Sequence, residues 1–156
     1  MTLVAPPLHA HGIVRQQQAG LPVASSVSVP AGASWLIVGG TLAEVSNPGA
    51  PPGSAASLGD TAAQARSILA RIKAELNSAG FAMDDIVNME VYLVADPDKN
   101  GRVDALGLTS ALLAYFGKDT EGLPTRSTVE VAGLPVPGAL VQIAVTAARI
   151  SHSESE

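Results

Sequence analysis

A single arginine near the carboxyl-terminal end of the sequence precedes a short run of strand-like residues. Arg126 lies in "GLPTRSTVEV" (122–131), ahead of residues 127–131, which have the pattern of a half-buried strand. A planar guanidinium binds a carboxylate through two parallel charge-assisted hydrogen bonds, which fix both the charge and the orientation of a small acid. An arginine in a strand also commonly pairs with an acid of its own protein, here Glu130 or an acid of a neighbouring subunit. The residues alone therefore leave a ligand-binding role and a structural ion pair open.

The segments around this arginine predict an alternation of strands and helices. Strands are expected, from their apolar patterns, at 23–29, 35–38, 86–94, 127–131 and 140–148. Two amphipathic helices are expected: the first begins with a capping box of Thr61 and Gln64 and is closed by Gly80, and the second spans 103–116. The order ββαβαββ, with a hairpin at each end, predicts an α+β domain whose two helices pack on one face of a mixed sheet.

Length and composition predict a single domain. The chain has 156 residues, of which 47% are hydrophobic and 15% charged, and this is enough apolar material for one core. We expect an irregular amino-terminal arm over 1–20, a single domain over 21–149 and a disordered acidic tail over 150–156. The small share of charged residues also favours an oligomer that buries part of the apolar surface.

Charge and residue usage argue against several classes of protein. The net charge is −5 and Lys and Arg total nine, which is a poor basis for binding nucleic acid. The chain has no cysteine, so disulfides, thiolate zinc sites and cysteine nucleophiles are excluded. No apolar run approaches the roughly 20 residues of a membrane span, and the first residues lack a signal-peptide pattern. We expect a soluble cytoplasmic protein that binds neither nucleic acid nor a membrane.

Two short patterns have some of the ligands of a metal site but not enough of them. His9 and His11 alternate in the predicted arm, where no third ligand accompanies them. The segment "DPDKNG" (96–101) resembles the start of a calcium-binding loop, but Gly107 stands where such a loop needs a bidentate carboxylate. We therefore expect no metal site, a mobile arm, and a polar connection at 96–101.

Longer stretches of the sequence together resemble one known family. They are "DTAAQARSILARIKAELNSAG" followed by "DDIVNMEVYL", then "LPTRSTVEVAGLP", and finally "GALVQIAV". In order and spacing, from about residue 35 to 148, they resemble the Rid family (YjgF/YER057c/UK114) of reactive-intermediate deaminases. The resemblance implies a chorismate-mutase-like fold, a homotrimer with clefts between subunits, and hydrolysis of imines or enamines to a carbonyl compound and ammonia. It implies no metal or organic cofactor, and it makes Arg126 the group that binds the substrate carboxylate.

Several cleft positions implied by the resemblance carry other residues in this chain. Val23 stands in place of a tyrosine, Thr109 in place of an asparagine, and Gln142 in place of a glutamate that positions or activates water. The "SGQ" element has lost its serine but keeps a glycine, Gly40, which allows a substrate close to the backbone. An amide such as Gln142 orients water but cannot take its proton. By resemblance, the main chain at Thr128 also lines the cleft.

The altered cleft leaves three functions open. The first is hydrolysis of a small imine or enamine, with Arg126 and Gln142 as the catalytic residues. The second is deamination of a larger catabolite of the aminomuconate type, for which the missing tyrosine leaves room. The third is a non-catalytic trimer that binds a small acid. A further hypothesis is that His9, His11 or Arg15 of the arm closes over the cleft and replaces the lost groups.

Overall fold

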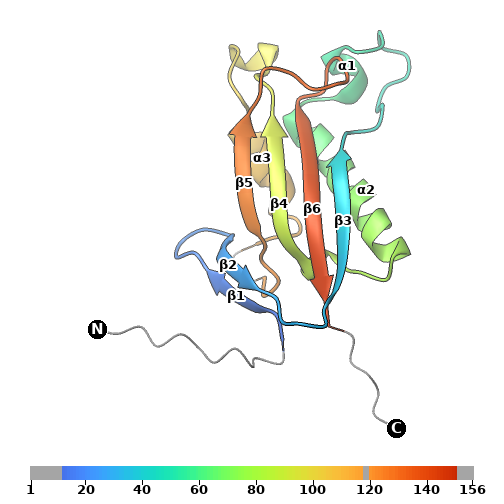
Figure 1. Cartoon of the computed structure of the whole chain (residues 1–156). Coiled ribbons are helices and arrows are strands. Elements are labelled where there is room, and N and C mark those ends of the chain that lie inside the picture. Colours follow the sequence, from blue (N-terminus) through green and yellow to red (C-terminus); the bar gives the residue numbers. More distant parts are fainter. Residues whose placement is uncertain (1–11, 118–119, 151–156) are drawn as a thin grey trace.

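Four strands form the main sheet of the protein. The computed structural model describes residues 12–117 and 120–150. In the main sheet the strand order is β3-β6-β4-β5 (Figure 1). The strands are β3 (Ser34–Thr41), β4 (Ile86–Leu93), β5 (Thr125–Glu130) and β6 (Val141–Arg149). Strand β6 is antiparallel to both β3 and β4, whereas β4 and β5 are parallel. The predicted mixed sheet is confirmed.

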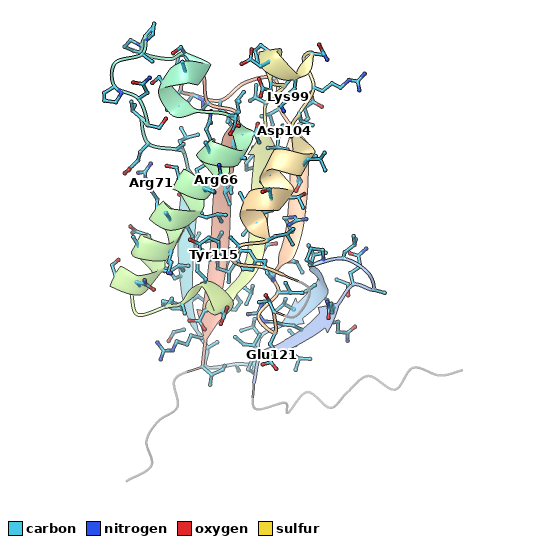
Figure 2. The ribbon with its side chains drawn as sticks, turned by 180° about the vertical axis from the view of Figure 1, so that it is seen from behind. Arg66, Arg71, Lys99, Asp104, Tyr115 and Glu121 are labelled. Atoms are coloured by element: carbon cyan, nitrogen blue, oxygen red, sulfur yellow. The ribbon has the colours of Figure 1, made fainter. Side chains whose placement is uncertain are left out.

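Two helices cover one face of this sheet. Helices α2 and α3 lie side by side behind the strands in Figure 1 and in front of them in Figure 2. We call the covered side the helix face and the opposite side the open face. The described helices are α1 (Ala55–Leu58), α2 (Thr61–Ser78) and α3 (Ala105–Leu112), with short 3-10 turns η1 (Met83–Asp85) and η2 (Pro97–Lys99). None of these helices is both long and apolar enough to cross a membrane.

The alternating pattern of β4 decides which side chains face the helices. Met89, Val91 and Leu93 are buried against them, and Glu90 and Tyr92 lie on the open face. Helix α2 supplies the opposing layer through its fully buried residues Ile68, Leu69, Ile72 and Leu76. Each such side chain stabilises the fold by about 1.5–3 kcal/mol when removed from water. The core therefore lies between β4, β6 and α2, as the periodicity of the sequence indicates.

The amino-terminal end of α2 differs from the prediction in one respect. Asp60 caps the helix, because its side chain accepts a hydrogen bond from Ala63 N at 2.8 Å. The predicted capping box of Thr61 and Gln64 is therefore wrong. Both residues lie inside the helix and are fully buried. At the other end, Gly80 follows the helix with a φ of 81°, as expected of a closing glycine.

Buried Gln64 connects α2 to the segment that leads into β6. Its Nε2 donates to Gly59 O at 2.9 Å and to Gly138 O at 3.0 Å, and its Oε1 accepts from Leu140 N at 2.8 Å. Gly138 has a φ of 79°, and a Cβ there would lie 2.6 Å from Gly53 O. Glycine is thus required where the chain turns towards Gln64. These bonds fix the start of β6 relative to the helix.

The amino-terminal segment corrects two of our expectations. Strand β1 (Val14–Gln17) pairs with β2 (Ala24–Ser28) in a separate antiparallel sheet, at the end of the main sheet where β4 and β5 begin (Figure 1). The predicted irregular arm over 1–20 is therefore wrong for the residues of β1. The predicted hairpin between β2 and β3 is also wrong: Ala24 N donates to Pro124 O at 2.9 Å, which fastens β2 beside β5 instead.

The carboxyl-terminal hairpin is a further correction, because β4 lies between β5 and β6. The connection at 131–140 crosses the end of β4 and delivers β6 to the middle of the sheet, where both its edges find partners. Most of the predicted acidic tail, 151–156, lies outside the described residues. The part of the arm before residue 12 does so as well.

Arg15 holds the small sheet of β1 and β2 to the main domain. Its guanidinium donates to three main-chain carbonyls: Ile86 O at 2.7 Å, Leu123 O at 2.8 Å and Asp84 O at 2.8 Å. Burial lowers the pKa of Arg15, and the nearby carboxylates of Asp85 and Asp84 act in the opposite direction. The guanidinium thus joins β1 to the start of β4, to the turn before it and to the segment that leads into β5.

Gln64→Leu tests how far the domain depends on the buried amide. The substitution keeps a side chain of similar size but leaves Leu140 N and two carbonyls unpaired in the core, so we expect the free energy of unfolding to fall by about 2–4 kcal/mol. Urea denaturation measures this change. The control is Gln16→Leu on exposed β1, which should change stability by less than about 0.5 kcal/mol. Equal stabilities of the two variants would contradict this role of Gln64.

Candidate functional site

Gln142 and Gly40 meet on the open face of the main sheet. Gln142, near the start of β6, pairs with Tyr92 of β4. Gly40 lies in β3 where the register to β6 shifts, between Val38 and Thr41. A Cβ built on Gly40 would lie only 1.6 Å from Nε2 of Gln142. The Gln142 amide therefore lies directly over the backbone of Gly40, and glycine is needed to let it do so.

An open pocket of about 350 Å³ lies beside these two residues. We call it the Gln142 pocket. Its walls come from three strands and from the connection that follows β5. It is lined by Gly40, Tyr92, Val131, Gly133, Leu134, Pro135, Gln142 and Ala144. A pocket of this size accommodates a small organic acid, and the Gln142 amide and the Tyr92 hydroxyl are the side-chain polar groups that line it.

Arg126 lies on the other side of the sheet. In the parallel pairing of β4 with β5, Arg126 is opposite Met89 and Thr128 is opposite Val91. Residues paired in this way point to the same face, so Arg126 and Thr128 lie on the helix face of the edge strand β5. Partial burial lowers the pKa of Arg126.

Within the described residues, Arg126 makes no hydrogen bond or ion pair. The alternative ion pair with Glu130 is not formed. Among the described residues, ion pairs join Arg71 to Glu44 and Lys99 to Asp104. Figure 2 shows Arg71 on α2 and the Lys99–Asp104 pair at the end of the sheet beyond α3. A half-buried guanidinium with no such partner is suited to bind an anion that comes from outside the chain.

Two further predicted site residues, Val23 and Thr109, do not line the Gln142 pocket. Val23 is buried next to β2, whose Ala24 bonds to the chain just before β5 and Arg126. Thr109 is exposed on α3, and its hydroxyl donates to Ala105 O at 2.8 Å within the helix. Val23 therefore lies near the Arg126 end of β5, and the Thr109 hydroxyl already has a main-chain acceptor.

One chain does not bring Arg126 and Gln142 together. Their partners on β4 are Met89 and Tyr92, three residues apart, so the two side chains are separated by roughly 10 Å along the strands. They are also two strands apart, which adds roughly 10 Å across the sheet. Because they occupy opposite faces as well, a small acid bound to one chain contacts one of them only.

The structure adds two residues that the sequence analysis did not select. Tyr92 lines the Gln142 pocket, and its hydroxyl donates to Glu90 Oε2 at 3.1 Å. This hydrogen bond, with the charge of Glu90, raises the pKa of the Tyr92 phenol above its ordinary value. The sequence contained an indication of this site, because the alternating pattern of β4 places Glu90 and Tyr92 on the face away from the core.

The arm does not supply Arg15 to the Gln142 pocket of its own chain. Arg15 binds carbonyls at the end of the sheet where β4 begins. Gln142 lies at the opposite end, because β6 runs antiparallel to β4. The hypothesis that Arg15 replaces the missing groups is therefore wrong within one chain. His9 and His11 lie outside the described residues.

The segment 96–101 forms the polar connection that we expected. Asp96 Oδ1 accepts a hydrogen bond from Asp98 N at 2.9 Å, and η2 follows it. The carboxylate of Asp96 thus caps a turn. In residues 12–117 and 120–150, no three His, Asp or Glu side chains are grouped closely enough to hold a metal ion.

A family model described as endoribonuclease L-PSP matches residues 22–149. The match spans most of the chain and includes Gly40, Arg126 and Gln142. The chain belongs to the YjgF/Rid family. The resemblance inferred from the sequence motifs is therefore confirmed.

Curated relatives of the YjgF/Rid family match part of the chain. A RutC family protein of Pyrococcus horikoshii is 38% identical over 77 residues, which are 49% of this chain and 54% of the relative. A 2-iminobutanoate/2-iminopropanoate deaminase of Escherichia coli (strain K12) is 38% identical over 76 residues, which are 49% of this chain and 55% of the relative. The matches thus span about half the length of these relatives.

Solved structures of YjgF/Rid proteins share the fold. The YjgF gene product of Escherichia coli is 29% identical with a TM-score of 0.56, over 86% of this chain and 93% of that one. TdcF of Escherichia coli, solved with bound serine, is 27% identical with a TM-score of 0.57, over 86% and 94%. A Rid family protein of Yersinia pestis, 24% identical, has a TM-score of 0.62 over 88% and 99%, which shows the fold alone.

Gly40→Ala should displace the Gln142 side chain without unfolding the domain. The new methyl group meets the flexible end of Gln142, and the φ of Gly40 is not positive, so we expect a stability change below about 1 kcal/mol. The side-chain amide resonances of Gln142 should shift strongly in NMR spectra. The control is Gly39→Ala, whose Cβ meets no atom within 4 Å. Similar shifts in both variants would refute the contact.

Proposed function

We propose that the protein hydrolyses an imine or enamine of a small carboxylic acid to the carbonyl compound and ammonia, in a cleft between two copies of the chain. The observation that carries the proposal is the half-buried Arg126, which lacks a partner among the described residues and lies on the opposite face from the Gln142 pocket. The deaminase names of relatives that are 36–38% identical over part of the chain support the reaction class.

The separation of Arg126 from Gln142 favours a symmetric ring of subunits. The Arg126 edge of one copy meets the Gln142 pocket of the next, and such a head-to-tail contact between two different surfaces closes into a ring. We propose a homotrimer. Apolar side chains on the open face support its assembly, since Trp35 is 56% exposed and Ile37 is 77% exposed in the isolated chain.

The Arg126 half of the cleft would bind the substrate carboxylate. The guanidinium offers two parallel hydrogen bonds, which fix the plane of the acid. Main-chain groups of Thr128 add to this half. Val131 N donates to Leu93 O at 2.8 Å, and because alternate residues of a parallel strand bond the same neighbour, the N–H and C=O of Thr128 point away from β4.

The Gln142 half would hold the water. The amide accepts a hydrogen bond from the water and orients it towards the imine carbon. When the carbon–oxygen bond forms, the C=N electron pair moves to nitrogen, which takes up a proton. The carbinolamine then loses ammonia as the C–N bond breaks and the hydroxyl becomes a carbonyl. An enamine enters the same sequence after a proton adds to its carbon, and water is the only co-reactant.

The replacement of a glutamate by Gln142 favours a second candidate, a trimer that binds the acid without turnover, because an amide is no general base. A larger substrate of the aminomuconate type is a variant of the first proposal. The endoribonuclease description of the family model has little support from a chain with a net charge of −5.

Ammonia release separates these candidates. The substrates are 2-aminoacrylate, 2-iminobutanoate and a bulkier 2-imino acid, each generated in the assay. We expect the wild type to accelerate release and Arg126→Ala to lower kcat/KM by about 100-fold, because the carboxylate loses both charge-assisted bonds.

The matched control is Arg66→Ala, an exposed arginine of α2 (Figure 2). It should leave the rate unchanged. Calorimetric binding of a 2-keto acid without turnover of any imine would select the non-catalytic trimer. Equal rates for Arg126→Ala and the wild type would contradict the anchoring role.

A further inference from the structure

Two residues of β4 bring a carboxylate and a phenol to the Gln142 pocket. Tyr92 lines the pocket directly opposite Gln142, and its hydroxyl donates to Glu90 Oε2 at 3.1 Å. Glu90 is opposite Ala144, another residue of the pocket wall. Glu90 does not itself line the pocket and is linked to it through the Tyr92 hydroxyl. The pair therefore lies beside the place where the proposed water binds.

No other ionisable side chain shares this face in the strands that the structure describes. Strand β6 presents Gln142, Ala144 and Thr146 beside β4, and β5 presents uncharged residues on its other side. The neighbours of Glu90 and Tyr92 across the strands and in the adjoining loop are Trp35, Ile37, Gly39, Gly40, Asn88, Thr125, Ser127, Val129, Val131, Leu134, Pro135, Gln142, Ala144 and Thr146. Glu90 is thus the carboxylate available to the pocket from its own chain.

We propose that Glu90 and Tyr92 form the proton relay of the reaction and replace the carboxylate that is absent at position 142. This inference rests on the proposed deamination. A carboxylate accepts a proton from water and an amide does not, so Gln142 orients the water and Glu90 takes its proton through Tyr92.

Both steps of the hydrolysis balance with this relay. As the water oxygen bonds to the imine carbon, its proton passes to Tyr92 Oη and the tyrosine proton passes to Glu90 Oε2. The C=N pair moves to nitrogen, which takes a proton back through the same two groups. In the second step the hydroxyl loses its proton by this route and becomes the carbonyl. The C–N pair leaves with nitrogen, which takes up that proton and departs as ammonia.

The raised pKa of the Tyr92 phenol is consistent with this role. The hydrogen bond to Glu90 raises the pKa of the phenol further above neutral pH, and the protonated hydroxyl has a proton to pass on. The bond also orients the hydroxyl, which leaves its lone pairs free to accept a proton from the water.

Two conservative substitutions test the relay. Tyr92→Phe keeps the ring and removes the hydroxyl, and Glu90→Gln keeps the size and removes the base. We expect each to lower kcat for 2-iminobutanoate by about 100-fold, with KM changed by less than about 3-fold, because Arg126 still binds the carboxylate.

A rescue experiment distinguishes the relay from a structural role. Gln142→Glu added to Tyr92→Phe restores a carboxylate beside the water and should recover at least about 10-fold of the lost kcat. The control is Tyr115→Phe, whose ring lies on the helix side (Figure 2) and packs against Phe116. It should retain wild-type kcat.

The outcomes separate the relay from the deamination itself. An active wild type with full kcat in both Tyr92→Phe and Glu90→Gln would overturn the relay and leave the proposed function standing. A wild type that releases no ammonia from any imine would overturn the proposed function and the relay with it. Loss of kcat in the variants without rescue by Gln142→Glu would assign the pair a structural role and also overturn the relay.

Discussion

The buried amide of Gln64 is the interaction on which the rest of the structure depends. Its three hydrogen bonds join α2 to the segment that enters β6, in a region from which water is excluded. Unpaired, each of these groups would cost about 1–3 kcal/mol. Strand β6 is central in the sheet. Leu140, just before this strand, donates its N–H to Gln64 Oε1, and Gln142 follows two residues later. The position of the pocket therefore follows from a helix residue on the opposite side of the sheet.

The topology of the sheet then divides the candidate site in two. Parallel pairing places Arg126 on the helix face of an edge strand, and antiparallel pairing places Gln142 on the open face of a central one. Two different surfaces of one chain thus carry complementary halves: a cation without a partner in the described residues, and a pocket with water-binding groups. In the proposed trimer, assembly of copies completes the site and covers the apolar side chains that are exposed on the open face of one chain.

The sequence predicted what is decided locally. The period of α2 and the alternation of β4 follow from neighbouring residues, and so does the motif around Arg126. Strand partners depend on distant contacts: the alternating pattern at 23–29 suits β1 as well as β3, and the connection at 131–140 is long enough to cross β4. The spacing of Thr61 and Gln64 predicted a capping box, because residue spacing alone does not show that the Gln64 side chain is buried. Tyr92 was not predicted as a site residue, because the alternation of β4 identifies the residues of the open face but not the pocket on that face.

Mixing two inactive variants tests the shared cleft most directly. Arg126→Ala removes the proposed anchor from one surface, and Gly40→Leu fills the pocket on the other, so each variant alone should be inactive. Coassembly of equal amounts should restore about a quarter of wild-type deaminase activity, because that share of interfaces pairs an intact Arg126 with an intact Gly40. Activity that stays at the level of the separate variants, although mass spectrometry demonstrates mixed oligomers, would contradict a site built from two chains.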